Sequence, residues 1–346
     1  MPASAHPRRD SAESINTDII TLSRFILESQ RYDAKNATGE FSLLLNSLQF
    51  AFKFISQTIR RAELVNLMGL AGASNATGDQ QKKLDVLGDE IFINAMRASG
   101  NVKVLVSEEQ EELLVFRHNP ATYAVCCDPI DGSSNLDAGV SVGTIVSLFK
   151  LLPDSQGSTK DVLRCGREMV AACYAMYGAS THLMLTTGNG VNGFTLDTNL
   201  GEFILTYPDL KMPLEFPIYS VNEGNSVYWE EPIQQFFQQL KVPKSELKDK
   251  PYSSRYIGSM VADVHRTLLY GGLFAYPSDQ KNPKGKLRLL YEAFPMAFLV
   301  EQAGGKAVND RGERILDLTP ENIHDKSSIW LGSKNDVEKY LKHIGK

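Results

Sequence analysis

Residues 128–135, with the sequence DPIDGSSN, combine side chains that suit a cation with backbone that suits a phosphate. Asp128 and Asp131 lie three residues apart on a turn favoured by Pro129 and Gly132, so both carboxylates and the carbonyl between them can face one ion. The Gly-Ser-Ser run that follows offers consecutive backbone N–H groups and two hydroxyl groups, which suit a phosphate. The segment therefore predicts a cation site and a phosphate site side by side.

Further acidic residues stand where they can join this site. They are Asp79, Asp85, Glu108, Glu109 and Glu292, the last of which lies close in sequence to Lys281, Lys286 and Arg288. Each taken alone is more simply a solvated surface carboxylate, but most of them stand at strand ends and loop exits, where layered α/β proteins present their ligands. Two carboxylates about 4 Å apart repel by roughly 4 kcal/mol at an effective dielectric near 20, so convergence requires cations or protons. Because oxygen ligands alone favour Mg²⁺, with Mn²⁺ as a substitute, over Zn²⁺, the pattern predicts a multi-Mg²⁺ phosphate site.

Hydrophobic periodicity predicts the elements that must position these residues. Apolar residues at helical spacing predict helices over residues 18–28, 40–61 and 82–98. Runs of β-forming residues predict strands over residues 102–106, 123–127, 140–150, 169–177, 181–186, 191–196 and 202–205. Helices are predicted again over residues 260–270, 296–302 and 337–343. Helices packed on two sheets, a layered α/β or α+β class, follow from this order.

Length and local composition predict two domains. The 346 residues fit two units of ordinary size, and Pro208, Pro213 and Pro217 place a boundary near residue 212, between units 1–212 and 213–346. The chain carries 36 Lys and Arg against 41 Asp and Glu, a net charge of -5, so it has no basic excess for a nucleic acid or an anionic membrane. Apolar runs fall far short of the ~20 residues that span a bilayer.

The termini and the cysteines indicate an intracellular protein. The first ten residues contain no apolar run typical of a signal peptide, and the last residues are not a peroxisomal tripeptide, so we expect a cytoplasmic location, or a peroxisome-like organelle if a C-terminal signal has been truncated. Four cysteines without CxxC spacing predict reduced and mostly buried thiols. Cys126 and Cys127 would point to opposite faces of a strand.

Several motifs together resemble one family. DPIDGSSN with the upstream SEE at residues 107–109 resembles the magnesium-dependent, lithium-sensitive phosphatase superfamily. Four further motifs closely resemble the fructose-1,6-bisphosphatase family: GDQQKKLDVL at residues 78–87, NEG at 222–224, RYIGSMVADVHRTLLYGG at 255–272 and GKLRLLYEAFPMA at 285–297. These motifs extend from the first helices to the last third of the chain, and the long run from Arg255 is highly specific.

The resemblance implies a five-layer α-β-α-β-α subunit, assembled as a homotetramer, that hydrolyses fructose 1,6-bisphosphate to fructose 6-phosphate and phosphate in gluconeogenesis. Unit 1–212 would bind AMP and carry most metal ligands, and unit 213–346 would bind the substrate. Carried onto matching positions, the Mg²⁺ ligands would be Asp79, Glu108, Asp128, the carbonyl of Ile130, Asp131 and Glu292. Asp85 and Glu109 would polarise the attacking water, and the displacement would be in line without a covalent enzyme intermediate.

The resemblance and the residue types also assign the substrate contacts. Gly132, Ser133 and Ser134 would hold the 1-phosphate, Gly258, Ser259 and Met260 would line the sugar pocket, and Asn222, Tyr256, Tyr276, Lys286 and Arg288 would face the second phosphate. Arg255 would reach the 6-phosphate of the neighbouring subunit. The alternative for both tyrosines is that they are core aromatics. Asn225 stands where the family commonly has a phosphate-binding Tyr, which puts one 6-phosphate contact in question.

A second phosphate site is predicted at the start of the helix over residues 40–61. The residues that resemble the family's AMP site are Thr38, Gly39, Glu40, Phe41 and Ser42, together with Tyr123 and Lys150. Free N–H groups and the positive end of a helix dipole attract an anion, whereas the simpler alternative is ordinary capping by Thr38. Thr122 and Lys150 replace a usual Lys and a usual Arg. We expect inhibition by AMP with altered cationic partners.

Two other functions remain open at this point. Within the enzymes, a sedoheptulose bisphosphatase or an inositol-phosphate phosphatase would share the DPIDGSSN core. In another class, a catalytically silent sugar-phosphate or nucleotide sensor would keep both pockets. The sensor would require a missing acid, and the complete set, including Asp85 and Glu109, favours the enzyme.

Overall fold

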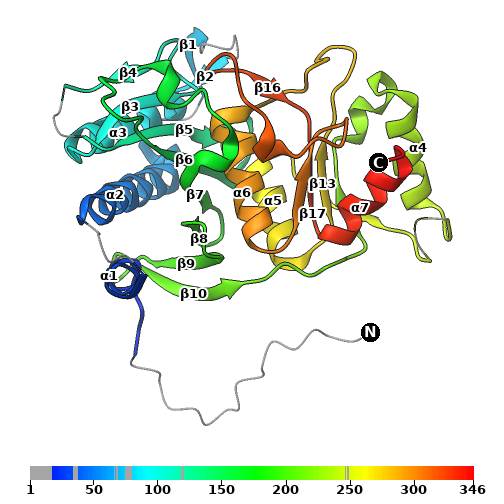
Figure 1. Cartoon of the computed structure of the whole chain (residues 1–346), viewed down its shortest axis with the longest axis horizontal. Helices are drawn as coiled ribbons and strands as arrows, with labels where there is room; N and C mark the ends of the chain where they lie inside the picture. Colours follow the sequence, from blue (N-terminus) through cyan, green and yellow to red (C-terminus); the bar gives the residue numbers. More distant parts are fainter. Residues whose placement is uncertain are drawn as a thin grey trace.

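Five layers of secondary structure succeed one another across the molecule, from left to right in Figure 1. The computed structural model describes residues 18–33, 38–65, 67, 69–74, 80–117, 121–245, 247 and 249–346. Helices α2 (Glu40–Arg61) and α3 (Lys83–Ala98) cover one face of an eight-stranded sheet, and α5 (Met260–Tyr270) and α6 (Phe294–Gln302) cover the other. A five-stranded sheet follows, and α4 (Glu231–Lys241) and α7 (Lys334–His343) form the last layer. The predicted five-layer α-β-α-β-α arrangement is therefore confirmed.

The eight-stranded sheet contains every strand predicted before residue 210. Its strands are β3 (Val102–Ser107), β4 (Leu114–Val115), β5 (Tyr123–Asp131), β6 (Val142–Lys150), β7 (Met169–Tyr177), β8 (Thr181–Thr186), β9 (Val191–Asp197) and β10 (Glu202–Leu210), in the order β10-β9-β8-β7-β6-β5-β3-β4. All neighbours are antiparallel except β3 and β5. This parallel pair matches Ser107 with Cys127, so β3 ends beside the middle of β5 and the residue after it, Glu108, lies next to Asp128.

The DPID segment differs from the sequence prediction because it belongs to a strand rather than to a turn. Strand β5 continues to Asp131, and its register with β6 shifts between Asp128 and Asp131. Pro129 has no N–H to donate to the ladder, which accounts for an irregularity at this point. The turn comes at Gly132, with φ 77°, and a 3-10 helix (Ser133–Ala138) follows. The irregular strand end thus carries both carboxylates.

The second sheet and the short elements complete the fold. The five-stranded sheet has the order β12-β11-β13-β17-β15, made of β11 (Ile218–Ser220), β12 (Ser253–Ser254), β13 (Leu273–Tyr276), β15 (Lys306–Val308) and β17 (Ile329–Gly332). Two small pairs join β1 (Leu70–Ser74) with β2 (Gln80–Lys82) and β14 (Leu287–Arg288) with β16 (Lys326–Ser327). A π-helical turn (Leu289–Ala293) leads into α6.

The first helix is displaced from its predicted position. Helix α1 spans Leu22–Asp33, four residues later at its start than residues 18–28 imply. The Thr21 hydroxyl accepts a hydrogen bond from the Arg24 N–H at 3.2 Å, as a residue that caps a helix start does. Thr21 also forms a β-bridge with Ile204, so this residue is extended rather than helical.

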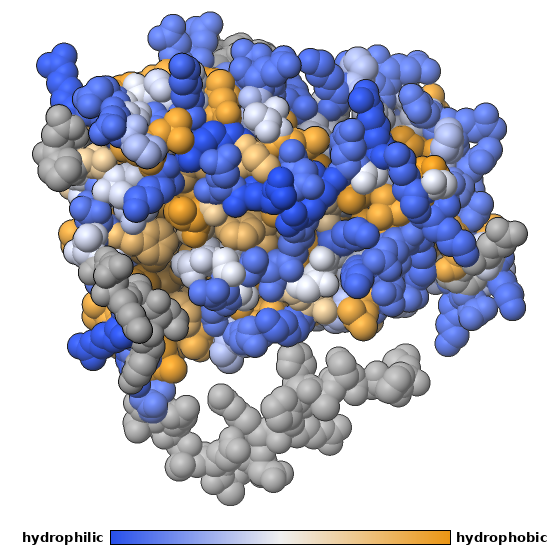
Figure 2. Space-filling view, viewed as in Figure 1, coloured by the Kyte–Doolittle hydropathy of each residue, from blue (hydrophilic) through white to orange (hydrophobic). Residues whose placement is uncertain are grey.

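The alternation of strand β5 places its two cysteines in different cores. Cys126 packs in the core between the two sheets, and Cys127 packs in the core beneath α2 and α3, as predicted. All four cysteines are free thiols, and only Cys165 is partly exposed. Among the residues described, no helix combines the length and the apolar character needed to cross a bilayer. Hydrophilic residues dominate the face in Figure 2, and the hydrophobic ones there form smaller scattered groups.

His265 of α5 lies buried between the sheets, where a proton would be costly. Its Nδ1 lies 2.9 Å from the Tyr174 hydroxyl, and its ring stacks on His182 with centroids 5.1 Å apart. Burial, followed by the charge of His182, lowers the pKa of His265 from 6.5 to about 3. The folded protein therefore holds this imidazole neutral.

We expect this histidine to make folding less favourable in acid. An unfolded chain takes up the proton near pH 6.5, so the contribution of His265 is complete above that pH and shrinks by about 2 kcal/mol at pH 5. Denaturant titrations of the wild type and His265→Gln at pH 7 and pH 5 will measure it. The difference between the two proteins isolates His265 from carboxylates whose raised pKa acts in the opposite sense. Equal acid losses in both proteins would contradict the prediction.

Candidate active site

A cavity of 610 Å³ collects residues from both halves of the chain. Of the residues predicted for the site, its lining includes Asp85, Glu108, Glu109, Asp128, Ile130, Asp131, Gly132, Ser133, Ser134, Asn222, Tyr256, Gly258, Met260, Tyr276, Lys286, Arg288 and Glu292. Arg255 and Ser259 are not part of the lining, because Arg255 is exposed on the surface and Ser259 is fully buried. Asp79 lies outside the described residues.

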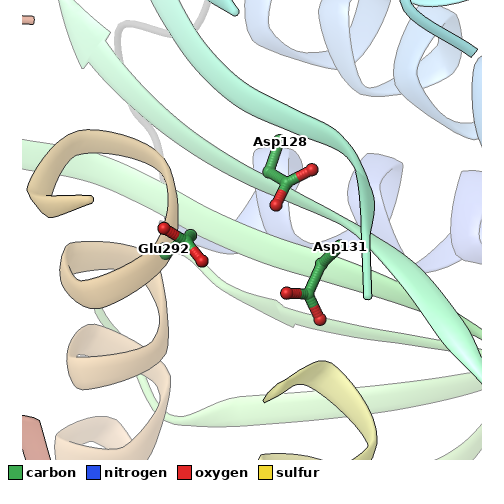
Figure 3. Close-up of side chains that lie close together, drawn as sticks. All are labelled: Asp128, Asp131 and Glu292. Atoms are coloured by element: carbon green, nitrogen blue, oxygen red, sulfur yellow. The ribbon is translucent and has the colours of Figure 1, made fainter. Parts of the chain in front are cut away.

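Three buried carboxylates face one another in this cavity (Figure 3). Asp128 and Asp131 come from the irregular end of β5, and Glu292 comes from the π-helical turn before α6. One oxygen atom of each lies within 4.8 Å of one oxygen atom of each of the others. Residues more than 160 positions apart in sequence therefore form an oxygen-only cluster of the kind that binds a hard divalent cation.

The carboxylates of the cluster hold their protons unusually strongly. Burial is the largest cause, and the nearby Glu108 adds to it: the pKa of Asp128 is raised well above its ordinary value and that of Asp131 to about 7. Burial likewise raises the pKa of Glu292 to about 8 and that of Asp85 to about 6. A site that raises several carboxyl pKa values together is one that gains from added positive charge.

Arg288 supplies positive charge to this site from within the protein. Its Nη2 lies 2.8 Å from Glu108 Oε1, and its Nη1 lies 3.7 Å from Glu292 Oε2. The Arg288 backbone N–H also donates to Glu292 Oε2 at 2.6 Å. Arg288 is 5% exposed, so its guanidinium is a structural counter-charge to the acids as well as part of the cavity wall.

Two buried oxygen atoms in the cavity remain available to a ligand. Asp128 Oδ1 and Asp85 Oδ1 have no hydrogen-bond partner among the described residues. The other oxygen of Asp85 accepts the Lys82 N–H at 2.7 Å, which fixes the carboxylate at the first turn of α3. An unpaired carboxylate oxygen is expensive to bury, so both atoms fit a role as ligands or hydrogen-bond acceptors in an occupied site.

The turn at Gly132 packs tightly against the start of α5. A Cβ atom on Gly132 would lie 2.8 Å from Ser259 Oγ, and its φ of 77° is one that other residues rarely adopt. Asp131 Oδ2 accepts the Val261 N–H at 2.8 Å, which ties the acid cluster to the same helix. The close approach leaves the Ser133 and Ser134 segment in the cavity wall, where its backbone can meet an anion.

Polar side chains from the second half line the remainder of the cavity. Asn222, Tyr256, Tyr276 and Lys286 all contribute to the wall. Tyr256 is 37% exposed, so it is not the core aromatic of the alternative interpretation. Arg255 is exposed, and its Nη1 donates to the Ser254 carbonyl at 2.8 Å, outside this cavity.

The start of α2 lies beside the start of β5, and several residues predicted for the second phosphate site are neighbours there. Rings of Phe41 and Tyr123 lie 5.7 Å apart, and the Thr122 hydroxyl donates to Glu40 Oε2 at 2.7 Å. Tyr123 is paired with Lys150 across strands β5 and β6. The residue that caps α2 is Gly39, with φ 87° and no side-chain hydrogen bond, so the alternative of capping by Thr38 is wrong.

Five residues of the cavity wall are absent from the predicted set: Leu70, Lys82, Asp263, Phe274 and Leu287. A signal existed for two of them. Lys82 immediately precedes helix α3, whose first turn carries Asp85, and its Nζ forms an ion pair with Asp137. Asp263 is an acid inside the apolar stretch MVADV, a position where a charge needs a specific partner. The other three are apolar residues that nothing in the sequence distinguishes from core residues.

Comparisons with known proteins agree with this geometry. Residues 20–208 match the family model described as fructose-1-6-bisphosphatase, N-terminal domain, and residues 212–344 match that of the C-terminal domain. The chain is 80% identical over 348 residues to the fructose-1,6-bisphosphatase of Kluyveromyces lactis, with 98% of each chain covered. It is 75% identical over 340 residues to that of Saccharomyces cerevisiae, covering 98% of this chain and 97% of the relative.

A solved structure shows the same fold. The crystal structure of Leishmania major fructose-1,6-bisphosphatase in holo form matches with a TM-score of 0.89 at 45% identity, covering 95% of this chain and 99% of that one. Both family models and these close relatives span almost the whole of the described chain. The chain therefore belongs to the fructose-1,6-bisphosphatase family of phosphatases.

Proposed function

We propose that this chain hydrolyses the 1-phosphate of fructose 1,6-bisphosphate to fructose 6-phosphate and phosphate, in a Mg²⁺-dependent reaction that serves gluconeogenesis. The observation that carries the proposal is the acid cluster of Asp128, Asp131 and Glu292 beside the Gly132 turn in one cavity. The polar side chains of Asn222, Tyr256, Tyr276 and Lys286 in the same cavity fit a substrate with a second phosphate. Family membership supports the same substrate.

The residues present fit Mg²⁺, because their buried donors are all oxygen atoms and two of those atoms lack partners among the described residues. Glu108, Asp128, Asp131, Glu292 and the Ile130 carbonyl would hold the ions, with Asp79 as a further proposed ligand. When bound, Mg²⁺ would neutralise charge on the phosphoryl oxygens and on the leaving oxygen.

The proton chemistry belongs to the protein. Burial raises the pKa of Asp85 to about 6, and its Oδ1 is a buried acceptor with no hydrogen-bond partner among the described residues. With Glu109 in the same wall, it would orient the attacking water and accept its proton. The backbone of Gly132, Ser133 and Ser134 would hold the 1-phosphate in line with that water.

The second phosphate would be held by other polar residues of the cavity lining. Asn222, Tyr256, Tyr276 and Lys286 supply amide, hydroxyl and ammonium donors, and the backbone at Gly258 and Met260 would border the sugar. Arg288 adds a cation to the wall. Arg255 is exposed on the surface and does not line the cavity of its own subunit, which supports a role for it at the 6-phosphate site of a neighbouring subunit.

A phosphate-release assay tests the proposed function. With Mg²⁺, release from fructose 1,6-bisphosphate should exceed release from fructose 6-phosphate, sedoheptulose bisphosphate and inositol monophosphate, and EDTA should stop it. Equal turnover of an inositol phosphate would assign the chain to another branch of the superfamily. No release under any of these conditions would indicate a catalytically silent sensor.

The regulatory and assembly proposals rest on the first helices. We propose an AMP site formed by Thr38, Gly39, Glu40, Phe41 and Ser42 with Tyr123 and Lys150, in a regulatory unit that ends near residue 212.

We propose a homotetramer, supported by Leu43 and Phe50, each 58% exposed, and Phe54, 47% exposed, along α2. Sedimentation will measure its mass. We also propose a cytoplasmic location, which the names of rice and Arabidopsis relatives carry as "cytosolic".

AMP should inhibit the reaction, and Tyr123→Ala should weaken that inhibition by about fivefold, because an aromatic contact contributes about 1 kcal/mol beyond the area that it buries. The measurement is the AMP concentration for half-inhibition at fixed substrate. Tyr228→Ala, which removes a tyrosine from the second half of the chain, is the control. Unchanged inhibition in Tyr123→Ala would place the nucleotide elsewhere.

A further inference from the structure

Asp263 is a buried acid that no step of the proposed reaction uses. It lies in the first turn of α5 and is 0% exposed. Its Oδ1 accepts the Ile257 N–H at 3.0 Å, and its Oδ2 accepts the Ile257 and Gly258 N–H groups at 3.1 and 3.0 Å. The carboxylate therefore binds the backbone of the loop that carries Tyr256 and Gly258 into the cavity.

The same carboxylate reaches a second segment of the substrate wall. The Ser220 hydroxyl donates to Oδ1 at 2.7 Å, and Ser220 is the last residue of β11, two positions before Asn222. Arg266 Nη2 donates to Oδ1 at 2.8 Å and supplies the counter-charge. Two pieces of chain that line the cavity thus meet at one buried group.

The loop needs an anchor of this kind. Gly258 has a φ of 90°, a conformation that is strained for other residues, and its N–H and the preceding one both point at Asp263. Tyr256 and Ile257 are 37% and 40% exposed, so their side chains are not fully buried in the core. We propose that Asp263 is a positioning residue, which fixes Tyr256 relative to Asn222 and thereby sets the affinity for the distal phosphate end of the substrate. This inference rests on the proposed function.

A carboxylate suits this position better than its amide. An ionised Asp only accepts hydrogen bonds, and here it accepts four donor groups, from Ile257, Gly258, Ser220 and Arg266. An Asn of the same shape would turn an NH₂ group toward at least one of these donors, leaving it buried without an acceptor. Asp263→Asn therefore loosens the loop without creating a cavity.

The test compares Asp263→Asn with Asp336→Asn, a matched control in the same half of the chain. Asp336 is 1% exposed and accepts the Tyr252 hydroxyl at 2.6 Å and the Phe216 N–H at 3.0 Å, but it does not line the cavity. Asp263→Asn should raise KM for fructose 1,6-bisphosphate by about tenfold and lower kcat by less than about threefold, as expected when uniform binding is lost. Asp336→Asn should leave KM unchanged.

Hydrogen exchange provides a readout that does not depend on turnover. The Ile257 and Gly258 amides should exchange faster in Asp263→Asn than in the wild type, and at the wild-type rate in Asp336→Asn. If Asp263→Asn does not fold, Ser220→Ala removes one donor and should raise KM by about threefold.

The outcomes separate this inference from the proposed function. A wild type that releases no phosphate overturns the proposed function, and faster exchange at Ile257 and Gly258 would still support the anchoring role of Asp263. An active wild type whose Asp263→Asn variant keeps both its KM and its exchange rates overturns the positioning role alone.

Discussion

Replacing Asp128 by Asn is expected to lower kcat by roughly 10³-fold or more, a loss of about 4 kcal/mol of transition-state stabilisation. Asp128 is 2% exposed, and its Oδ1 has no hydrogen-bond partner among the described residues, which fits a role as a ligand of the proposed ion. The amide carries no charge and only one acceptor oxygen. Phosphate release at saturating Mg²⁺ will measure the effect.

The same substitution should stabilise the metal-free protein while it damages the reaction. Asp128 lies near Glu108, Asp131 and Glu292, and these neighbours raise its pKa together with burial. At neutral pH the fold must keep a proton on Asp128 that the unfolded chain releases, and Asn removes this cost, so the Tm in EDTA should rise above that of the wild type and the increase in Tm caused by Mg²⁺ should shrink. A substitution that raises the Tm in EDTA while it lowers kcat indicates a cluster that serves function, whereas a structural cluster would lose stability.

Asp161→Asn is the control for this experiment. Asp161 is 0% exposed and accepts the Leu152 N–H, the Ser155 hydroxyl and the Ser158 N–H, away from the cavity. It should lower the Tm and leave kcat within about threefold. A kcat for Asp128→Asn within tenfold of the wild type would remove the metal cluster from the mechanism.

Arg288→Gln is expected to reduce the free energy of unfolding by about 3 kcal/mol in EDTA, because breaking a buried ion pair leaves its partners uncompensated. Arg288 is 5% exposed and contacts both Glu108 and Glu292. Added Mg²⁺ should restore part of the loss, since it brings positive charge to the same carboxylates. Denaturant unfolding with and without Mg²⁺ will show both effects.

Arg314→Gln provides the comparison at the surface. The Arg314 side chain is 42% exposed and lies 2.5 Å from Glu301, so solvent screens the pair and its loss should cost less than about 1 kcal/mol, independent of Mg²⁺. If Arg288→Gln were no more destabilising than Arg314→Gln, Arg288 would not be the counter-charge that its contacts suggest.

Periodicity predicted the elements well because it depends on neighbouring residues. The helix over residues 40–61 and the strand over residues 169–177 have the predicted bounds, and Cys126 and Cys127 face the predicted opposite cores. Helix α1 was displaced because Thr21 pairs with Ile204, a contact nearly two hundred residues away. Local signals carry no information about such a pairing.

The sequence predicts most of the residues that line the site, but it predicts fewer of the contacts between them. Residue type placed Arg288 at a phosphate, whereas the structure pairs its guanidinium with Glu108. That pairing depends on the parallel register of β3 with β5, which no short window of sequence reveals. The partners of Asp263 could not be predicted for the same reason, because its donors Ser220 and Ile257 become its neighbours only once β11 and α5 have packed.

The acid cluster draws on both halves of the chain, and this has a consequence during synthesis. Asp128 and Asp131 leave the ribosome long before Glu292, which emerges only with the turn that precedes α6. A nascent polypeptide therefore holds just a fragment of the cation-binding set for most of its translation. The proposed cations could bind the complete set of carboxylates only in the finished chain, so any stability that they add would come after Glu292 has been made.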